Sequence, residues 1–283
     1  MEIKASDVKN LREKTGAGMM DCKKALTEAS GDFAAAEKLL REWGMAGVEK
    51  RSGRATNEGR VFVKEVGTSI GLVEIACETD FVARNADFIA AGERMAGLVI
   101  ERGWTGPNAE LEAMVKDIAS VIKENISLKR VRLAQASAGE FVHSYVHGEG
   151  KIGVIVKVKA DKSEAFSNPK VIGFVHDVAL HIAAFNPMFL DQSKPDPAWV
   201  KEQEEIFAKQ VELDEKLKSK PKNVIEGVLK GKLKKLMAEV CLLDQGFVKD
   251  EKQSVAAFMA TVSKEAGIKL EFMEYQYIKV GEA

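Results

Sequence analysis

The strongest constraint on the fold is an order of sequence patterns that occurs twice. In residues 59–81, two β-rich runs flank a turn at 67–69, and an amphipathic helix follows. In residues 141–160, a second pair of such runs turns at 148–150, and the helical segment 171–185 follows. A hairpin followed by a helix, repeated, predicts an α+β protein with two related lobes. Sequence identity between the halves is low, so the repeat is one of architecture.

Residues 1–54 predict a small bundle of three helices. Ser6 is a good N-cap for the first helix, and a glycine-rich TGAG motif ends it. Gly31 closes the second helix, and Asp32 caps the third. Three helices of about ten residues joined by tight turns make a compact bundle. The charged, glycine-containing segment 49–59 then predicts a linker.

Residues 197–241 predict two antiparallel helices joined by a turn at 220–223. The first helix carries Ile206, Leu213 and Leu217 at heptad-like steps. Because the apolar stripes are narrow, we expect this coiled-coil hairpin to project from the body of the protein. The stripe of the returning helix consists of Ile225, Leu229, Leu233, Leu236 and Val240.

The remaining patterns complete the expected domain organisation. A second helix of the first lobe is expected at about 110–126, and the C-terminal part predicts a helix at 255–267 and a strand at 268–280. The expected domains are the bundle at 1–54, core lobe 1 at 55–140, and core lobe 2 at 141–283 with the helical hairpin inserted at about 197–241.

Charge and cysteine content bound the function. The net charge is −1 over 283 residues, which argues against a surface built throughout to bind DNA or RNA. Cys22, Cys77 and Cys241 lie far apart, which favours a reducing compartment over disulfides or a thiolate zinc site. No signal-peptide pattern occurs, and no apolar run approaches the roughly 20 residues of a membrane span. We therefore expect a cytoplasmic protein without membrane association.

No catalytic or metal-binding pattern emerges from the titratable residues. His143 and His147 have an i, i+4 spacing, but in a strand-like run four residues span about 13 Å. His176 and His181 lie five apart on a predicted helix and face directions about 140° apart. Motifs for phosphate loops, dinucleotide binding and nucleophile elbows are absent. The sequence therefore predicts a protein that is not an enzyme, needs no cofactor and acts on another macromolecule.

A lysine-rich stretch of the helical hairpin leaves a second interpretation open. The functional interpretation is RNA contact through phosphates. The acidic first arm balances this charge and no aromatic residues are interleaved to stack bases, so a solvated helical face is favoured. An RNA-binding or assembly module is kept as the alternative. The lysines are Lys216, Lys218, Lys220, Lys222, Lys230, Lys232, Lys234 and Lys235.

Three motifs together resemble one protein family. They are LREKTGAGMMDCKKAL at 11–26, ETDFVARN at 78–85 and SYVHGEGKIGVIV at 144–156. They are similar to the bacterial elongation factor Ts family, the guanine nucleotide exchange factors of elongation factor Tu in protein biosynthesis. The resemblance covers nearly the full chain. It implies a ubiquitin-associated-like N-terminal bundle and a coiled-coil protrusion.

The resemblance also implies which residues meet elongation factor Tu, in its GDP-bound and nucleotide-free forms. Thr79, Asp80, Phe81 and Val82 match an element that enters the partner near its magnesium site and dislocates Mg²⁺. His147 matches a contact near the phosphate loop of the partner. Loss of Mg²⁺ removes a charge that neutralises the diphosphate, so GDP leaves faster. By reciprocity, a factor that prefers the empty GTPase weakens GDP binding equally.

Other implied contacts lie in the bundle and near the C-terminal part. Phe247 and Val248 match a contact near the third domain of the partner, although Gly246 and Lys249 stand where the family often has a proline and an apolar residue. The chain stops at Ala283, after a VGE that in some relatives leads into a C-terminal helix. The bundle residues that match contacts with the GTPase domain are Arg12, Met19, Met20 and Lys23.

The residues by themselves leave the placement of three apolar side chains open. Of Met19 and Met20, we expect one to be buried and the other exposed, because an exposed methionine suits a partner surface. Phe81 either folds back as first-turn core or stands exposed as a wedge. The family resemblance favours the wedge.

Overall fold

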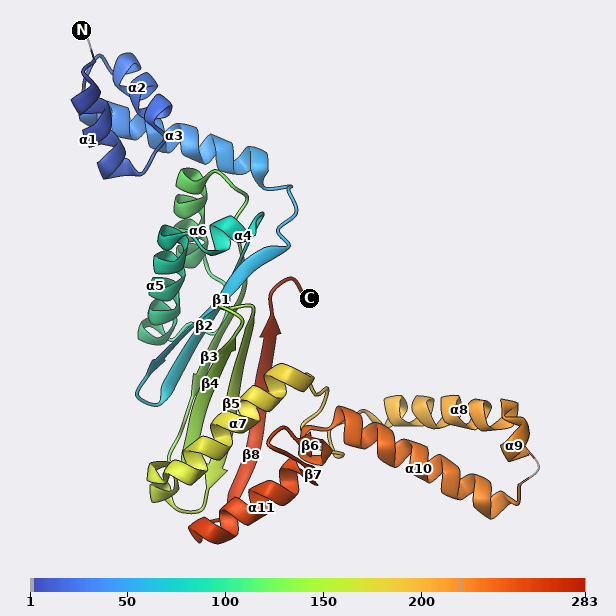
Figure 1. Ribbon diagram of the computed structural model, residues 1–283. Coiled ribbons are helices and arrows are strands. Elements are labelled where there is room, and N and C mark those ends of the chain that lie inside the picture. The colour runs from blue at the N-terminus through green and yellow to red at the C-terminus, as the bar shows by residue number, and fades with distance from the viewer. Residues whose placement is uncertain (1–2, 219, 283) are drawn as a thin grey trace. The chain divides into compact units, whose positions relative to one another are not determined.

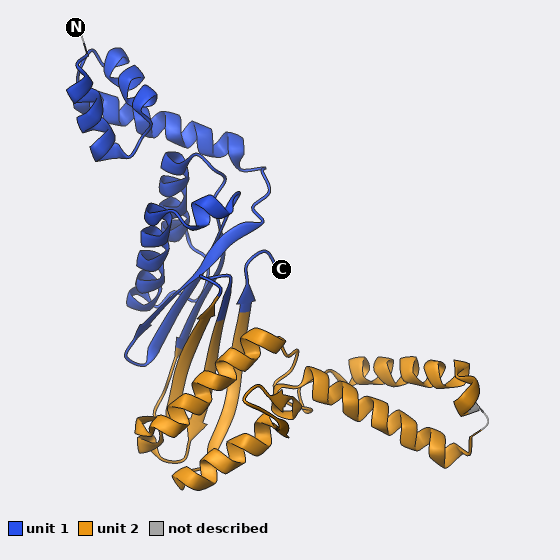
Figure 2. Cartoon of the chain, viewed as in Figure 1, with its two compact units in different colours: residues 1–134, 148–153, 278–283 blue, residues 135–147, 154–277 orange. Residues whose placement is uncertain are grey.

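The computed structural model describes residues 3–218 and 220–282 (Figure 1). Helices and strands are mixed along the chain, which confirms the α+β class. No helix among the described residues is long and apolar enough to cross a membrane. The chain divides into two compact units, coloured in Figure 2: residues 1–134, 148–153 and 278–283 form unit 1, and residues 135–147 and 154–277 form unit 2.

Unit 1 begins with three short helices, α1 (Ala5–Thr15), α2 (Met19–Glu28) and α3 (Phe33–Arg51). Asp32 caps α3 as predicted, because its carboxylate accepts a hydrogen bond from the backbone N–H of Ala35 at 3.0 Å. The three helices share an apolar core, which explains why such short elements are stable together. Its buried members are Val8, Leu11, Cys22, Ala25, Leu26 and Ala36.

Two boundaries in this region were predicted wrongly. The N-cap of the first helix is Lys4, so Ser6 lies inside the helix. The third helix continues to Arg51, so the predicted linker at 49–59 starts later than expected. The additional turns of α3 pack against the helix at 109–122, a long-range contact that local propensity does not reveal.

The first sheet of unit 1 has the strand order β1–β2–β3, with β1 (Glu58–Val66), β2 (Ser69–Cys77) and β3 (Ser127–Gln135). β1 and β2 pair in antiparallel register around the predicted turn. Helix α5 (Ala86–Arg102) packs on both strands, and α6 (Ala109–Ile122) packs against α3 and α5.

The close approach of α5 to this sheet depends on Gly92. A Cβ atom at this position would lie 2.3 Å from the ring of Phe62 on β1, so only glycine fits. Phe62 also packs on Phe88, with ring centroids 5.7 Å apart. Phe62 and Phe88 belong to the same buried core as Cys77, the last residue of β2, and the candidate site begins directly after Cys77.

Unit 2 contains the sheet β4–β5–β8, formed by β4 (Glu140–His147), β5 (Ile152–Ala160) and β8 (Leu270–Lys279). Helix α7 (Pro169–Phe185) packs on β4, and α11 (Val255–Ala266) packs on α7. The first two residues of β5, 152–153, and the last two of β8, 278–279, are assigned to unit 1. The hairpin-then-helix order is thus present in both lobes, as the sequence predicted.

A small second sheet of unit 2 joins β6 (Gly246–Phe247) to β7 (Asp250–Ser254) in antiparallel fashion. Two 3₁₀ turns, η1 (Ser163–Ser167) and η2 (Leu242–Asp244), connect the larger elements. Aromatic rings fill the space between α7, α11 and the strands. The rings in contact are Phe174, Phe247, Phe258 and Phe272.

The segment after α7 forms α8 (Pro197–Leu213), the short α9 (Glu215–Lys218) and α10 (Lys222–Val240). Helices α8 and α10 pack against each other, and Figure 1 shows them as two arms that run side by side. Asp196 caps α8, because its side chain accepts a hydrogen bond from the backbone N–H of Ala198 at 2.7 Å.

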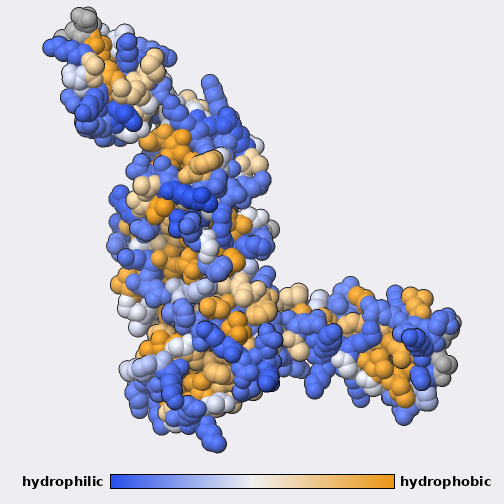
Figure 3. Space-filling view, viewed as in Figure 1, coloured by the Kyte–Doolittle hydropathy of each residue, from blue (hydrophilic) through white to orange (hydrophobic). Residues whose placement is uncertain are grey.

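The apolar stripe predicted for the first arm was wrong. Ile206 is 41% exposed and Leu213 is 83% exposed, whereas Val211 is buried. Figure 3 shows the resulting apolar patches on the surface of these helices. The heptad step fails because α8 ends at Leu213 and Asp214 adopts an extended conformation, so Leu213 and Leu217 do not belong to one continuous helix.

Candidate functional site

The ETDF motif lies where β2 ends and a single helical turn, α4 (Asp80–Ala83), begins. Thr79 is extended and serves as N-cap, and its hydroxyl accepts a hydrogen bond from the backbone N–H of Val82 at 3.4 Å. A helix places successive side chains about 100° apart, so neighbours in this turn face different directions.

Phe81 stands exposed on this turn. Its side chain is 80% exposed, while Val82 and Ala83 are only 8% and 5% exposed and belong to the core of the lobe. Asp80 is half-exposed and lies 3.6 Å from Arg84 in an ion pair. Of the two placements left open by the sequence, the structure therefore has the exposed one, and no internal packing of Phe81 has to be broken first.

Two carboxylates join this turn to the loop after α6. Glu124 accepts hydrogen bonds from the backbone N–H groups of Glu78 and Thr79, both at 3.1 Å, and from the Thr79 hydroxyl at 2.6 Å. Glu78 in return accepts from the backbone N–H of Asn125 at 2.6 Å. Burial, and next the charge of Glu124, raise the pKa of the adjacent Cys77 thiol to about 12.

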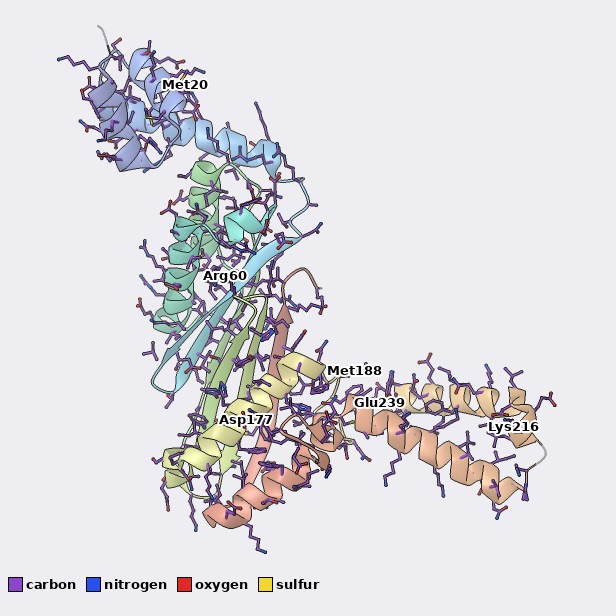
Figure 4. The ribbon with its side chains drawn as sticks, in the orientation of Figure 1. Met20, Arg60, Asp177, Met188, Lys216 and Glu239 are labelled. Carbon is purple, nitrogen blue, oxygen red and sulfur yellow. The ribbon has the colours of Figure 1, made fainter. Side chains whose placement is uncertain are left out.

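Four residues of the bundle were expected to contact a partner. Arg12 and Lys23 are exposed, and Met19 and Met20 are 49% and 77% exposed. The prediction that one methionine would be buried was wrong, because the core of α2 begins at Cys22 and both methionines precede it. Figure 4 labels Met20 at the surface of the bundle.

His147 is exposed at the end of β4. Its Nδ1 atom lies within hydrogen-bonding distance of the hydroxyl of Tyr145, at 3.1 Å. The sequence did not reveal a second histidine contact, in which Nε2 of His143 on β4 lies 3.0 Å from Nδ1 of His176 on α7. The described residues contain no group of three or more His, Cys, Asp or Glu that could hold a metal ion.

Phe247 is fully buried in unit 2, unlike Phe81 in unit 1. Val248 is half-buried, and its backbone N–H donates to Nδ1 of His181 at 3.2 Å. Because Nδ1 accepts, the proton of His181 is on Nε2, which donates to the side-chain oxygen of Gln245 at 2.9 Å. Burial lowers the pKa of His181 against an opposing effect of that hydrogen bond. The predicted partner contact of Phe247 stays a prediction, and its ring supports the turn from inside.

Gly246 and Lys249, the two residues that depart from the family pattern, both lie at the surface of unit 2. Gly246 is exposed, and a Cβ there would lie 3.0 Å from the carbonyl oxygen of Glu251 on β7. Lys249 is exposed and forms an ion pair with Asp177 of α7 at 3.2 Å. Figure 4 labels Asp177 on this helix. The polar Lys249 is thus held at the surface by a partner that the sequence pattern did not indicate.

Lys222, Lys232 and Lys235 of the helical hairpin have side-chain partners on the hairpin itself. Lys232 donates to Gln210 at 3.1 Å, and its ammonium lies 5.6 Å from the ring centroid of Phe207. Lys235 pairs with a glutamate one turn further along at 3.9 Å. Such i, i+4 pairs are typical of a solvated helix face.

Comparison with known proteins identifies the chain. A family model described as elongation factor TS matches residues 78–282. The elongation factor Ts of Treponema denticola is 46% identical over 282 residues, which is 99% of each chain. That of Borrelia garinii subsp. bavariensis is 44% identical over 280 residues, again 99% of each. These matches define an elongation factor of protein biosynthesis. More specifically, the chain belongs to the elongation factor Ts family.

Proposed function

We propose that this chain is a guanine nucleotide exchange factor of elongation factor Tu. It binds the GDP form, disturbs the Mg²⁺ site and promotes GDP release during translation elongation in the cytoplasm. Membership of the family supports the partner and the activity. The observation that carries the mechanism is Phe81, which is 80% exposed although the next two residues are buried.

The exposed ring provides the binding energy for such a mechanism. Full burial of a phenylalanine side chain contributes about 1.5–3 kcal/mol. That corresponds to roughly a 10- to 150-fold change in an equilibrium constant. Because only interactions that differ between two states shift their equilibrium, the ring must enter a space that opens when Mg²⁺ and GDP leave. Asp80 adds a carboxylate, the type of ligand that Mg²⁺ prefers.

Other regions are assigned supporting roles in this proposal. The N-terminal helices act as a ubiquitin-associated-like domain that docks on the GTPase domain through Arg12, Lys23 and the two exposed methionines. His147 approaches the phosphate loop, and the turn with Val248 approaches the third domain. The helical hairpin is an accessory coiled-coil arm. The chain itself performs no covalent chemistry and uses no cofactor.

Stopped-flow release of a fluorescent GDP from elongation factor Tu tests the proposal. We expect Phe81→Ala and Asp80→Ala each to lower the stimulated release rate by about tenfold or more, the equivalent of about 1.4 kcal/mol. Leu213→Ala is the matched control, because Leu213 is equally exposed and lies on the accessory arm. Wild-type release rates with both turn variants would contradict the proposal.

The alternative, an RNA-binding or assembly module that uses the lysine-rich hairpin, has its own test. A salt-dependent shift of RNA that disappears when Lys232, Lys234 and Lys235 are replaced by alanine would support it. No contact in the described hairpin favours this alternative over the exchange function.

A further inference from the structure

Phe81 is held by a turn that its own ring does not stabilise. The ring is mostly in solvent, so packing of Phe81 cannot determine where it points. The helix that carries it, Asp80–Ala83, has only four residues, and a single helical turn is unstable in water. The direction of Phe81 must therefore be fixed by contacts on either side of it.

On the C-terminal side, Val82 and Ala83 insert into the core of the lobe. On the N-terminal side, the contacts come from Glu124, which accepts three hydrogen bonds from the segment that precedes Phe81. Hydrogen bonds to a charged acceptor are roughly twice as strong as neutral ones. We propose that Glu124 is a positioning residue that fixes the Phe81 turn for exchange, an inference that rests on the proposed function.

The local backbone explains why Glu124 reaches the turn. Helix α6 ends at Ile122, and the following Lys123 has a left-handed conformation with a φ of +67°, so the chain has left the helix before Glu124. The next residue, Asn125, donates from its side chain to the backbone oxygens of Ser52 at 3.2 Å and Arg54 at 2.6 Å. The carboxylate that holds the turn is therefore itself held by the linker after α3.

The same contacts separate the roles within the TDFV motif. The Thr79 hydroxyl donates to Glu124 and accepts from the backbone N–H of Val82, so both of its functions are used inside the chain. Thr79 and Val82 therefore position the turn, and Asp80 and Phe81 are the two residues left to meet a partner. If the turn is correctly placed in only a fraction of the molecules, the apparent affinity for the partner equals the intrinsic affinity multiplied by that fraction.

Amide hydrogen exchange on the isolated chain tests the structural half of this inference. We expect Glu124→Ala to accelerate exchange of the backbone amides of residues 79–84 by about tenfold or more, while the amides paired between β1 and β2 are unchanged. Thr79→Val removes both hydrogen bonds of the hydroxyl, to Glu124 and from the N–H of Val82, but keeps the two backbone bonds to Glu124. It is expected to give a smaller acceleration in the same residues. The control is Glu112→Ala, because Glu112 is an exposed glutamate on the preceding helix α6. Unchanged exchange at 79–84 in Glu124→Ala would overturn the inference.

GDP release from elongation factor Tu, measured with a double-mutant cycle, tests the functional half. We expect Glu124→Ala to slow stimulated release by roughly tenfold in the wild-type background, since small misplacements of a positioned group carry such costs. In a background that lacks both presented side chains, Asp80→Ala with Phe81→Ala, it should change the rate less than about twofold, because the groups it positions are gone. Equal effects in both backgrounds would overturn the inference.

The two measurements keep this inference separate from the proposed function. If Phe81→Ala and Asp80→Ala both release GDP at the wild-type rate, the proposed function fails, and the amide exchange still decides whether Glu124 holds the turn. If Glu124→Ala lowers the yield of folded protein, Glu124→Gln takes its place. The amide keeps one acceptor oxygen but turns an NH₂ toward the donors of the turn, so it is expected to act in the same direction.

Discussion

Two turns of this protein carry a similar short motif and place it in opposite ways. In TDFV of unit 1, Phe81 is 80% exposed and Val82 is 8% exposed. In QGFV of unit 2, Phe247 is fully buried and Val248 is half-buried. A phenylalanine followed by a valine therefore does not determine which of the two faces solvent. The backbone that carries the motif determines it.

The physical cause is the kind of element that each motif enters. Thr79 caps a helical turn, and the helical rotation directs Val82 inward and Phe81 outward. Phe247 instead belongs to β6 and packs between Phe174 and Phe258, with ring centroids 5.7 Å and 4.7 Å away. One aromatic ring is therefore available for a partner, and the other stabilises its own unit.

The largest expected effect sharpens this contrast in stability. Phe247→Ala removes a fully buried ring and is expected to lower the free energy of unfolding by about 3–5 kcal/mol. Phe81→Ala removes an exposed ring and is expected to change it by less than about 0.5 kcal/mol. Urea denaturation of both variants measures the difference. Similar losses of stability in the two variants would break the comparison.

A second effect concerns the histidine beneath the Phe247 turn. The folded pKa of His181 is lowered by burial, so between that value and about 6.5 the unfolded chain binds more protons than the folded chain. Stability is thus fully present above pH 6.5 and falls as the pH is lowered through 6.5 toward the folded pKa. Thermal denaturation from pH 5.5 to 7.5 should show a flatter profile for His181→Gln. Parallel profiles would show that His181 does not contribute this dependence.

The smallest expected effect concerns the helical hairpin, which carries exposed apolar residues but no motif of the TDFV kind. Replacing residues 200–238 by a short linker should change stimulated GDP release by less than about twofold, because the deleted segment contains none of the residues assigned a contact in the proposal. Circular dichroism controls for folding of the deletion. If a folded deletion variant lost all stimulated GDP release, the arm would be as necessary for exchange as Phe81, and the comparison would fail.

The sequence predicted much of the fold, because hydrophobic periodicity and turn residues are local signals. The two hairpin-and-helix lobes, the Asp32 cap and the helical arms are present. What it could not predict depends on tertiary contacts. The extension of α3 to Arg51 needs packing on α6, and the exposure of Leu213 follows from a break in the helix at Asp214.

The candidate site was predictable in part for the same reason. The position of the ETDF motif after a strand followed from the residues, which left the placement of Phe81 open, and the family resemblance favoured its exposure. Glu124 was not predictable, because it lies 45 residues from Thr79 in the sequence and falls inside the helix that the sequence predicted at about 110–126. The ion pair between Lys249 and Asp177 was not predictable for the same reason, because the two residues lie far apart in the sequence. Contacts between distant segments leave no signal in a single sequence.

The central claim is that the exposed Phe81 acts on the Mg²⁺ site of the partner. The most direct test is the rate of GDP release from elongation factor Tu with wild-type chain and with Phe81→Ala, each at millimolar Mg²⁺ and after chelation with EDTA. If the ring works by displacing Mg²⁺, the variant should be slower by about tenfold or more with Mg²⁺ present, the equivalent of about 1.4 kcal/mol, and most of this deficit should vanish once Mg²⁺ is removed. An equal deficit under both conditions would contradict the account.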